Sequence, residues 1–148
     1  MDFRVGFYPL RTLNQSYCPK DPIPLHKKSG IYRLNCGQCN AQYVGQTGRS
    51  LTTRLADHRR AYTNKKPSES AMAKHCLEQH HNYDLVQNTL LHSCKKGQLM
   101  NKLEEIETIA AYSTDQHNLL NDLDSVYVTP LTRFYYNFSP PSPSPHDN

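Results

Sequence analysis

The sequence predicts a small α/β domain in which a short, mainly antiparallel three-stranded sheet is flanked by helices. Two short runs of β-favouring residues, at 30–34 and 41–45, enclose a turn-like segment, which is typical of a β hairpin. Three helical patterns and one further β-rich run follow along the chain. The 148 residues are the length of a single domain that can bury its own core.

Each later element has its own pattern of apolar residues. Ser50, a favoured N-cap, is expected to begin the first helix, with Leu51, Leu55 and Tyr62 near one face. The last helix is expected to bury an apolar stripe at helical spacing. The expected ranges are 51–62, 68–79 and 96–112 for the helices and 84–94 for the third strand, and the stripe consists of Leu99, Leu103, Ile106 and Ala110.

The composition divides the chain into three parts. Residues 1–28 contain four prolines and little periodicity, which predicts an extended lead segment. Residues 29–131 carry the predicted domain. Residues 132–148 form a Pro/Ser-rich tail with too little apolar surface to offset the entropy of ordering it, so we expect this tail to lie outside the fold.

Composition also restricts the class of protein. The chain has a mean hydropathy of −0.77 and no run near the roughly 18 apolar residues of a membrane span, and its first residues lack a signal peptide's apolar segment. A soluble intracellular protein without a membrane partner is therefore expected. Five cysteines, an odd number, favour metal ligation or free thiols over a complete disulfide framework.

Charge is distributed unevenly. Residues 26–74 contain ten Lys or Arg and two acidic residues, whereas residues 101–148 contain two Lys or Arg and seven acidic residues. A basic half of this density suits a polyanion such as nucleic acid, because phosphates supply most of the non-specific binding energy. A solvated basic face without a partner is the competing interpretation of charge alone.

Several residue types suited to phosphodiester hydrolysis occur together. Tyr32 and Tyr43 lie in the two β-rich runs, and Arg54 and His58 are one helical turn apart on the first helix. Hydrolysis needs a base that activates water, a fixed cation and a carboxylate that holds a divalent metal. Taken singly, each group is more often a packing or solvated residue. The third helix supplies the carboxylates Glu104, Glu105 and Glu107.

Four short motifs occur in order: GIY at 30–32, YVG at 43–45, QTGRSLTTRLADHRR at 46–60 and, after the acidic helix, HNLLN at 117–121. Together they resemble a GIY-YIG endonuclease domain. The segments KDPIPLHKKSGIYRLNC and SAMAKHCLEQHH, with the cysteine pair in the hairpin, are similar to the endonuclease region of Penelope-like retroelements. The resemblance covers about residues 20–131. That family carries a reverse transcriptase upstream, which these residues do not contain, so a detached module or fragment is expected.

The resemblance implies a role for each matching residue. Tyr32 and Tyr43 would line the active site, with Tyr32 activating the attacking water. Gly45 would let the backbone come close. Arg54 would stabilise charge on the scissile phosphate, and His58 would assist proton transfer or hold the phosphate.

A glutamate on the third helix would hold one Mg²⁺. The family's Leu-Glu step favours Glu104, although Thr108 stands where that pattern has an aliphatic residue. Glu105 remains the alternative, because helical phase does not separate the two. Asn121 would complete the site or brace it.

A second constellation suggests a metal site. Cys36-x2-Cys39 in a turn, with His-x4-His or His-x5-His later in the chain, is a familiar source of a tetrahedral Cys2His2 zinc site. Two free thiols and a His-rich helix end are the competing interpretation. The resemblance implies a structural Zn²⁺ held by Cys36, Cys39, His75 and His81, with His80 as the alternative fourth ligand.

The predicted function is a Mg²⁺-dependent, retroelement-derived endonuclease that nicks DNA and acts in the nucleus, where its substrate lies. A catalytically inactive, zinc-stabilised DNA-binding or interaction module is the alternative, and a fragment without a role is a third. We expect DNA to be positioned by a set of basic residues consisting of Lys27, Lys28, Arg49, Arg59, Arg60, Lys65 and Lys66.

Overall fold

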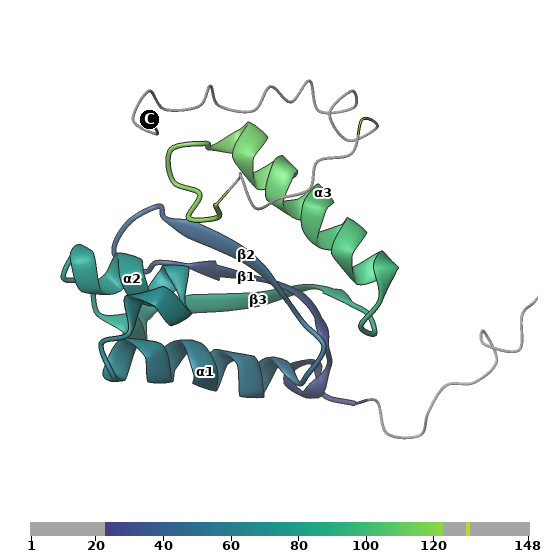
Figure 1. Ribbon diagram of the computed structural model, residues 1–148, viewed down its shortest axis with the longest axis horizontal. Helices are drawn as coiled ribbons and strands as arrows, with labels where there is room; N and C mark the ends of the chain where they lie inside the picture. Colours follow the sequence, from purple (N-terminus) through teal and green to yellow (C-terminus); the bar gives the residue numbers. More distant parts are fainter. Residues whose placement is uncertain (1–22, 123–129, 131–148) are drawn as a thin grey trace, which may run out of the picture.

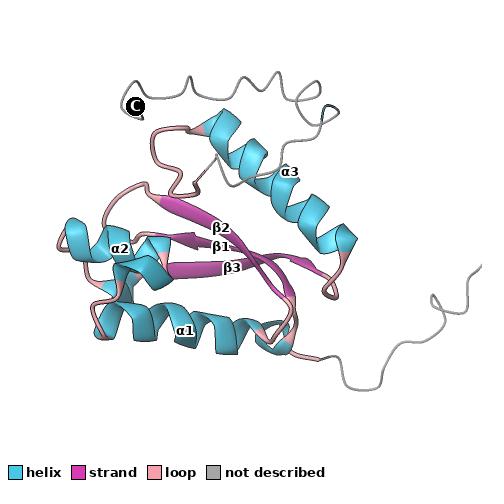
Figure 2. Cartoon of the chain, viewed as in Figure 1, coloured by secondary structure: helices cyan, strands magenta, loops and turns pink. Residues whose placement is uncertain are grey.

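A three-stranded antiparallel sheet forms the centre of the chain (Figure 2). The computed structural model describes residues 23–122 and residue 130. Most of the expected lead segment, the end of the expected domain and the Pro/Ser-rich tail therefore lie outside the described residues. Within the described part, the predicted small α/β domain with an antiparallel three-stranded sheet is confirmed.

The strands are β1 (Gly30–Asn35), β2 (Gln42–Thr47) and β3 (Gln87–Ser93), in the order β2-β1-β3. β1 and β2 form the predicted hairpin, with Tyr32 opposite Gly45. Because successive side chains of a strand point to opposite faces, Tyr32 joins one core cluster and the preceding residue joins the other.

Helices cover both faces of the sheet (Figure 1). α1 (Leu51–Thr63) and α2 (Ala71–Glu78) pack on the face that carries Tyr32, and α3 (Gln98–Thr114) packs on the other. Ser50 caps α1 as predicted, since its side chain accepts a hydrogen bond from the backbone N–H of Thr53. The edge strand β2 thus runs between the two helical layers.

The predicted apolar stripe of the third helix is wrong in phase. Leu99 and Ile106 are 64% and 39% exposed, and Leu103 and Ala110 are half-buried. The buried residues centre about 170° around the helix axis from the centre of the predicted stripe, at about 100° per residue. Hydrophobic periodicity misses this face because two of its members are polar. The buried residues are Met100, Glu105, Thr108, Ile109 and Ala111.

The expected extended lead segment is wrong for its last residues. Leu25–Lys27 form one turn of 3-10 helix. Thr52 Oγ1 donates a hydrogen bond of 2.9 Å to the carbonyl of His26, and the backbone N–H of Leu51 donates one of 3.0 Å to the carbonyl of Lys28. The Leu51 bond satisfies a backbone N–H in the first turn of α1, where no helical partner is available.

Two expected elements are shorter than predicted. α2 begins at Ala71 because Pro67–Glu69 form a separate 3-10 turn, and β3 begins at Gln87 because Tyr83–Leu85 form another. Among residues 23–122, no helix has both the length and the apolar character required to cross a membrane.

Candidate functional site

The Tyr32 hydroxyl lies at the centre of the first group of predicted site residues. Its oxygen is 2.7 Å from Nε2 of His58 and accepts a hydrogen bond of 3.1 Å from Nε of Arg54. Both partners come from α1, on which they lie one turn apart. The fold therefore brings the predicted tyrosine, arginine and histidine into direct contact.

Gly45 makes room for this contact. A Cβ atom at Gly45 would lie 2.8 Å from the Tyr32 hydroxyl oxygen and 2.7 Å from a ring carbon of Tyr43. Distances this short require the rings to move. At Gly45, the rings of Tyr32 and Tyr43 therefore lie close to the β2 backbone.

The ring of Tyr43 packs beside the rings of Tyr32 and His58. Its ring centroid is 5.7 Å from that of His58, edge to face, and 6.4 Å from that of Tyr32. Burial raises the pKa of both tyrosines above the ordinary value. Both phenols therefore carry their protons at neutral pH, and removing one requires a nearby base.

His58 is buried and uncharged at neutral pH. Burial, and then the charge of Arg54, lower the pKa of His58 to about 4. Its Nδ1 atom lies 2.7 Å from Oγ of Ser70, the N-cap of α2. Sequence reasoning missed Ser70: its position before a helical pattern signals a cap, but nothing local links it to His58.

Glu104 of α3 faces the same group across the β2 edge. Burial raises the pKa of its carboxyl group, whereas Gln46 and the charge of Arg54 act in the opposite direction. Glu104 also lines a pocket of about 890 Å³ together with Tyr43 and Gln46. Sequence reasoning also missed Gln46, because nothing in a single β-rich run shows which helix will lie beside it.

Glu105 occupies a different environment. It is buried, and Lys102 Nζ donates a hydrogen bond of 2.8 Å to its Oε2. It lines the same pocket, but Glu104 is the glutamate whose charge acts on Tyr32 and Tyr43. Of the two glutamates, Glu104 is therefore the one whose charge raises the pKa of the Tyr32 and Tyr43 phenols.

Asn121 braces the edge of the sheet. Its Oδ1 accepts a hydrogen bond of 2.9 Å from the Val44 N–H, and its Nδ2 donates one of 2.7 Å to the Val44 carbonyl. The preceding residue, Leu120, donates its N–H to the Gln42 carbonyl at 2.8 Å. The side chain of Asn121 is thus engaged with the β2 backbone beside Tyr43, which fits the expected bracing role.

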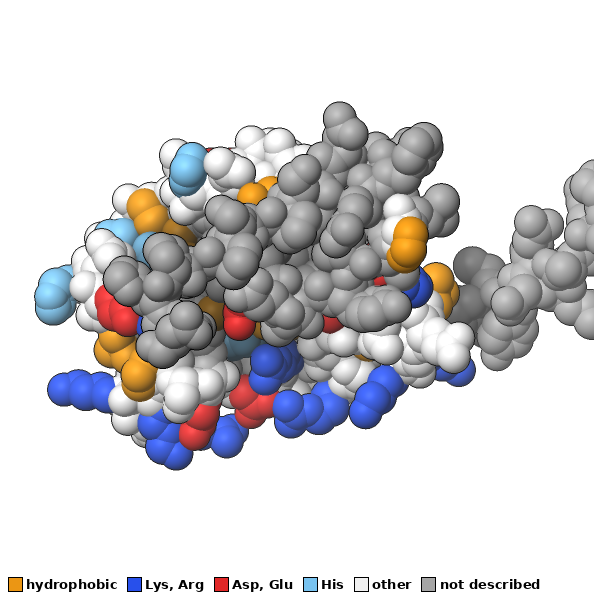
Figure 3. Space-filling view, turned by 45° about the horizontal axis from the view of Figure 1, so that its top comes forward, with side chains coloured by type: hydrophobic (Ala, Val, Ile, Leu, Met, Phe, Trp, Pro, Cys, Tyr) orange, Lys and Arg blue, Asp and Glu red, His pale blue; other side chains and the backbone are white. Residues whose placement is uncertain are grey.

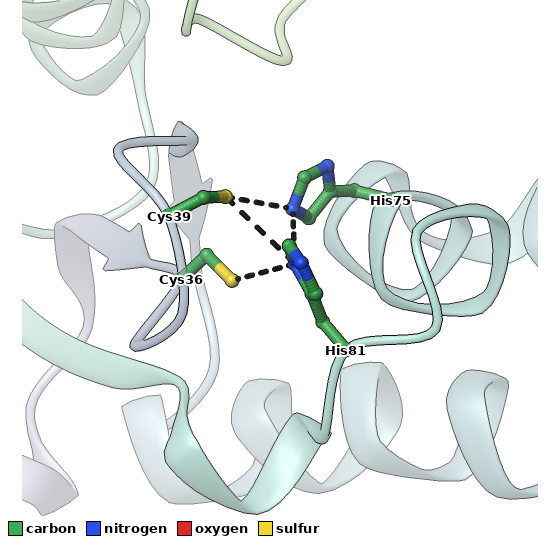
Figure 4. Close-up of side chains that lie close together, drawn as sticks. All are labelled: Cys36, Cys39, His75 and His81. Carbon is green, nitrogen blue, oxygen red and sulfur yellow. Dashed lines mark hydrogen bonds between the residues drawn. The ribbon is translucent and has the colours of Figure 1, made fainter.

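The second predicted group lies at the other end of the hairpin (Figure 4). Cys36 and Cys39 come from the β1–β2 connection, His75 from α2 and His81 from the segment after it. One donor atom from each of the four lies within 4.8 Å of all the others. Among the described residues, these four form a group that could hold a metal ion.

Four of the six separations between donor atoms are close to those around a tetrahedral ion. Cys36 Sγ to His81 Nδ1 and Cys39 Sγ to His75 Nε2 are both 3.3 Å, the two histidine nitrogens are 3.2 Å apart, and Cys39 Sγ to His81 Nδ1 is 3.8 Å. Zinc bonds of about 2.3 Å to sulfur and about 2.0 Å to nitrogen, at tetrahedral angles, separate ligand atoms by about 3.3–3.8 Å. The four residues could therefore hold a zinc ion.

The end of α2 selects His81 over His80. His80 has a φ of 56°, in the left-handed region, and the N–H of His81 bonds to the Cys76 carbonyl at 2.8 Å. This helix-ending turn reverses the chain so that His81 returns toward His75. His80 is exposed and outside the group.

The predicted basic set is partly neutralised. Asp57 pairs with both Arg49 and Arg60, Arg59 pairs with Asp84, and Lys66 pairs with Glu69. Figure 3 shows blue side chains along the lower rim of the molecule with red carboxylates between them. Within the described part of the chain, the members of the set without an ion pair are Lys27, Lys28 and Lys65.

Comparison with known proteins does not assign the chain to a family. No protein-family model matches the chain, and neither the curated proteins nor the solved structures include a significant match.

Proposed function

We propose that the chain is a metal-dependent DNA endonuclease of the GIY-YIG type that nicks DNA and derives from a Penelope-like retroelement. The observation that carries the proposal is the environment of the buried Tyr32 hydroxyl. Its oxygen contacts Nε2 of His58 and accepts a hydrogen bond from Nε of Arg54. The hydroxyl therefore has a proton acceptor on one side and, on the other, a cation that would stabilise the phenolate once the proton is transferred. A packing tyrosine needs neither neighbour.

The residues support a hydrolysis in which every proton has a destination. Tyr32 passes its phenol proton to His58 Nε2 and takes a proton from water as the water oxygen forms a bond to phosphorus. The bond between phosphorus and the leaving oxygen breaks, solvent protonates that oxygen, and His58 returns its extra proton to solvent. Arg54 lies where its charge offsets negative charge first on the phenolate and then on the phosphate.

Glu104 is the proposed Mg²⁺ ligand. Carboxylate oxygen is a ligand that Mg²⁺ prefers, and Mg²⁺ commonly keeps several waters beside one or two carboxylates, so one glutamate in an open pocket fits this ion. Bound Mg²⁺ would supply electrostatic stabilisation of the charged phosphate. The proposed Zn²⁺ would be structural, because Cys36 and Cys39 of the hairpin and His75 and His81 of the α2 region would hold it and so join the hairpin to α2.

DNA is the proposed substrate because basic residues lie on α1, which carries Arg54 and His58, and next to its N-terminus. Lys27 and Lys28 precede β1 and have no ion pair among the described residues. Arg59, which pairs with the exposed Asp84, can exchange this partner for phosphate. Nuclear localisation follows as a proposal from this substrate.

The test is relaxation of supercoiled plasmid by the zinc-loaded chain, with Mg²⁺ or with EDTA. Wild type should produce nicked circles only with Mg²⁺, and Tyr32→Phe should lower the rate by roughly 10²-fold or more. Tyr83→Phe is the matched control, because Tyr83 is a buried tyrosine of the same core cluster and lies outside the site. Equal rates for wild type and Tyr32→Phe would remove the proposed mechanism.

The alternative, an inactive module, needs the four metal-binding residues but is indifferent to Tyr32 and Arg54. It predicts DNA or protein binding without nicking. Intact plasmid together with DNA binding that weakens steeply with salt would favour that alternative.

A further inference from the structure

Ser70 connects α2 to the Tyr32–His58 pair. The residue is 5% exposed and lies immediately before α2. Its Oγ accepts a hydrogen bond of 3.1 Å from the Ala73 N–H, which caps the helix, and lies 2.7 Å from His58 Nδ1. The serine therefore has a capping role and, independently, a contact with the histidine of the candidate site.

We infer that Ser70 is a positioning residue whose hydroxyl oxygen accepts a hydrogen bond from Nδ1–H of His58, leaving Nε2 unprotonated toward Tyr32. The consequence for catalysis rests on the proposed nuclease function. The hydrogen-bond assignment itself does not, because it concerns only the resting protein.

Two proton arrangements fit the four atoms of this hydrogen-bonded chain, which are Ser70 Oγ, the two ring nitrogens of His58 and the Tyr32 hydroxyl oxygen. If Ser70 donates to Nδ1, the imidazole proton is on Nε2, and Nε2–H and Arg54 Nε–H both point at the Tyr32 oxygen. The phenol proton of Tyr32, which is 0% exposed, then has no acceptor among the described residues. If Ser70 accepts from Nδ1–H, Tyr32 donates to Nε2 and its proton has a partner. The second arrangement pairs the proton of the fully buried phenol and leaves unpaired among the described residues only the hydroxyl proton of Ser70, which at 5% exposed is the less buried of the two residues.

The second arrangement also suits proton transfer. When His58 takes the Tyr32 proton, both imidazole nitrogens carry hydrogen, and each already faces an acceptor: Ser70 Oγ and the phenolate oxygen. No side chain has to rotate at that moment. A serine oxygen has two lone pairs, so it can accept from Ala73 N–H and from Nδ1–H together.

The helix that holds Ser70 is also tied to the candidate metal group. α2 runs from Ala71 to Glu78 and carries His75, while His81 follows its end. A metal bound there would fix α2 against the hairpin that carries Tyr32. With that metal bound, the helix that positions the Ser70 hydroxyl would also be held at its other end.

The test is the tautomer of His58, measured from imidazole ¹⁵N chemical shifts in the full zinc-loaded chain at pH 7. We expect Nδ1–H in wild type and in Ser70→Thr, and a shift toward Nε2–H in Ser70→Ala. Ser50→Ala is the matched control. It removes an equivalent N-cap, from α1, and Ser50 has no hydrogen bond to His58. A wild-type proton on Nε2, or an unchanged tautomer in Ser70→Ala, would overturn the inference.

Nicking provides the second measurement. Ser70→Ala should lower kcat by about tenfold or more without changing KM for DNA, and Ser70→Thr should restore it. A KM effect alone would contradict a positioning role. If wild type has the expected tautomer but does not nick DNA, the proposed function fails while the hydrogen-bond assignment stands, so the two failures are distinguishable.

Discussion

Tyr32 and His58 meet through a 2.7 Å contact between the phenol oxygen and Nε2, although one lies on a strand and the other on a helix 26 residues later. The contact is buried, and Gly45 leaves the space in which it forms. A phenol beside an uncharged imidazole is a route for moving a proton out of a buried site. This pair therefore links the fold directly to the proposed chemistry.

The buried His58 should make stability depend on pH. Its pKa is lowered to about 4 in the folded protein, whereas an unfolded histidine titrates near 6.5. The unfolded chain therefore binds more protons between these values, so the contribution of His58 is fully present above about pH 6.5 and is lost as pH falls toward 4. The expected loss is about 3 kcal/mol.

Urea unfolding at pH 7 and pH 4 measures this effect. Wild type should lose about 3 kcal/mol more than His58→Asn between the two conditions. The comparison with the variant cancels the contributions of the other titrating groups. Equal losses in the two proteins would show that His58 is not held uncharged by burial.

Zinc binding should distinguish two adjacent histidines. His81→Gln removes a donor of the four-residue group and should abolish binding of one zinc per chain. His80→Asn should retain it, because His80 is outside the group and asparagine tolerates its left-handed backbone. Mass spectrometry of the native protein gives the stoichiometry. Zinc retained by His81→Gln and lost by His80→Asn would reverse the assignment.

Zinc should also stabilise the fold. At a hundred times its Kd, a ligand that binds only the folded state adds about 2.7 kcal/mol, which raises the Tm of a domain of this size by roughly 10 °C. Thermal unfolding with and without a chelator measures the shift. Cys39→Ser should show no chelator effect, and an equal effect in that variant would contradict the proposed ligand set.

The two adjacent glutamates should differ in nicking. Glu104→Gln should lower the Mg²⁺-dependent rate by about 10²-fold or more, because its carboxylate faces Arg54 and the two tyrosines. Glu105→Gln should change the rate far less, since its carboxylate pairs with Lys102. Rates at a series of Mg²⁺ concentrations test the assignment, and a larger loss in Glu105→Gln would transfer the metal to that residue.

Thr108 should be replaceable by valine with a gain in stability. Its Oγ1 is buried and has no hydrogen-bond partner among the described residues, so the hydroxyl loses its hydration without compensation. Thr108→Val keeps the shape and should raise the free energy of unfolding by about 1 kcal/mol. The control is Thr114→Val, which removes an exposed bond of 2.9 Å to the Ala110 carbonyl and should not stabilise the protein.

Local patterns were sufficient to predict the hairpin and the helices, whereas the members of the candidate sites came from the family resemblance. The hairpin, the Ser50 cap and the spacing of Arg54 and His58 depend on neighbours within a few residues, which sequence displays directly. The apolar stripe of α3 failed for a physical reason. Its buried face includes Glu105 and Thr108, so the face that meets the sheet is not the most apolar one.

Tertiary structure decided which chemically suitable groups meet. The amino-acid sequence determined the residue types, the hairpin and the Cys36-x2-Cys39 turn, because these depend on short-range geometry. Only the packed fold brought Ser70 to His58 and chose His81 over His80. Contacts between distant segments depend on how sheet and helices pack, and no local pattern encodes their distances.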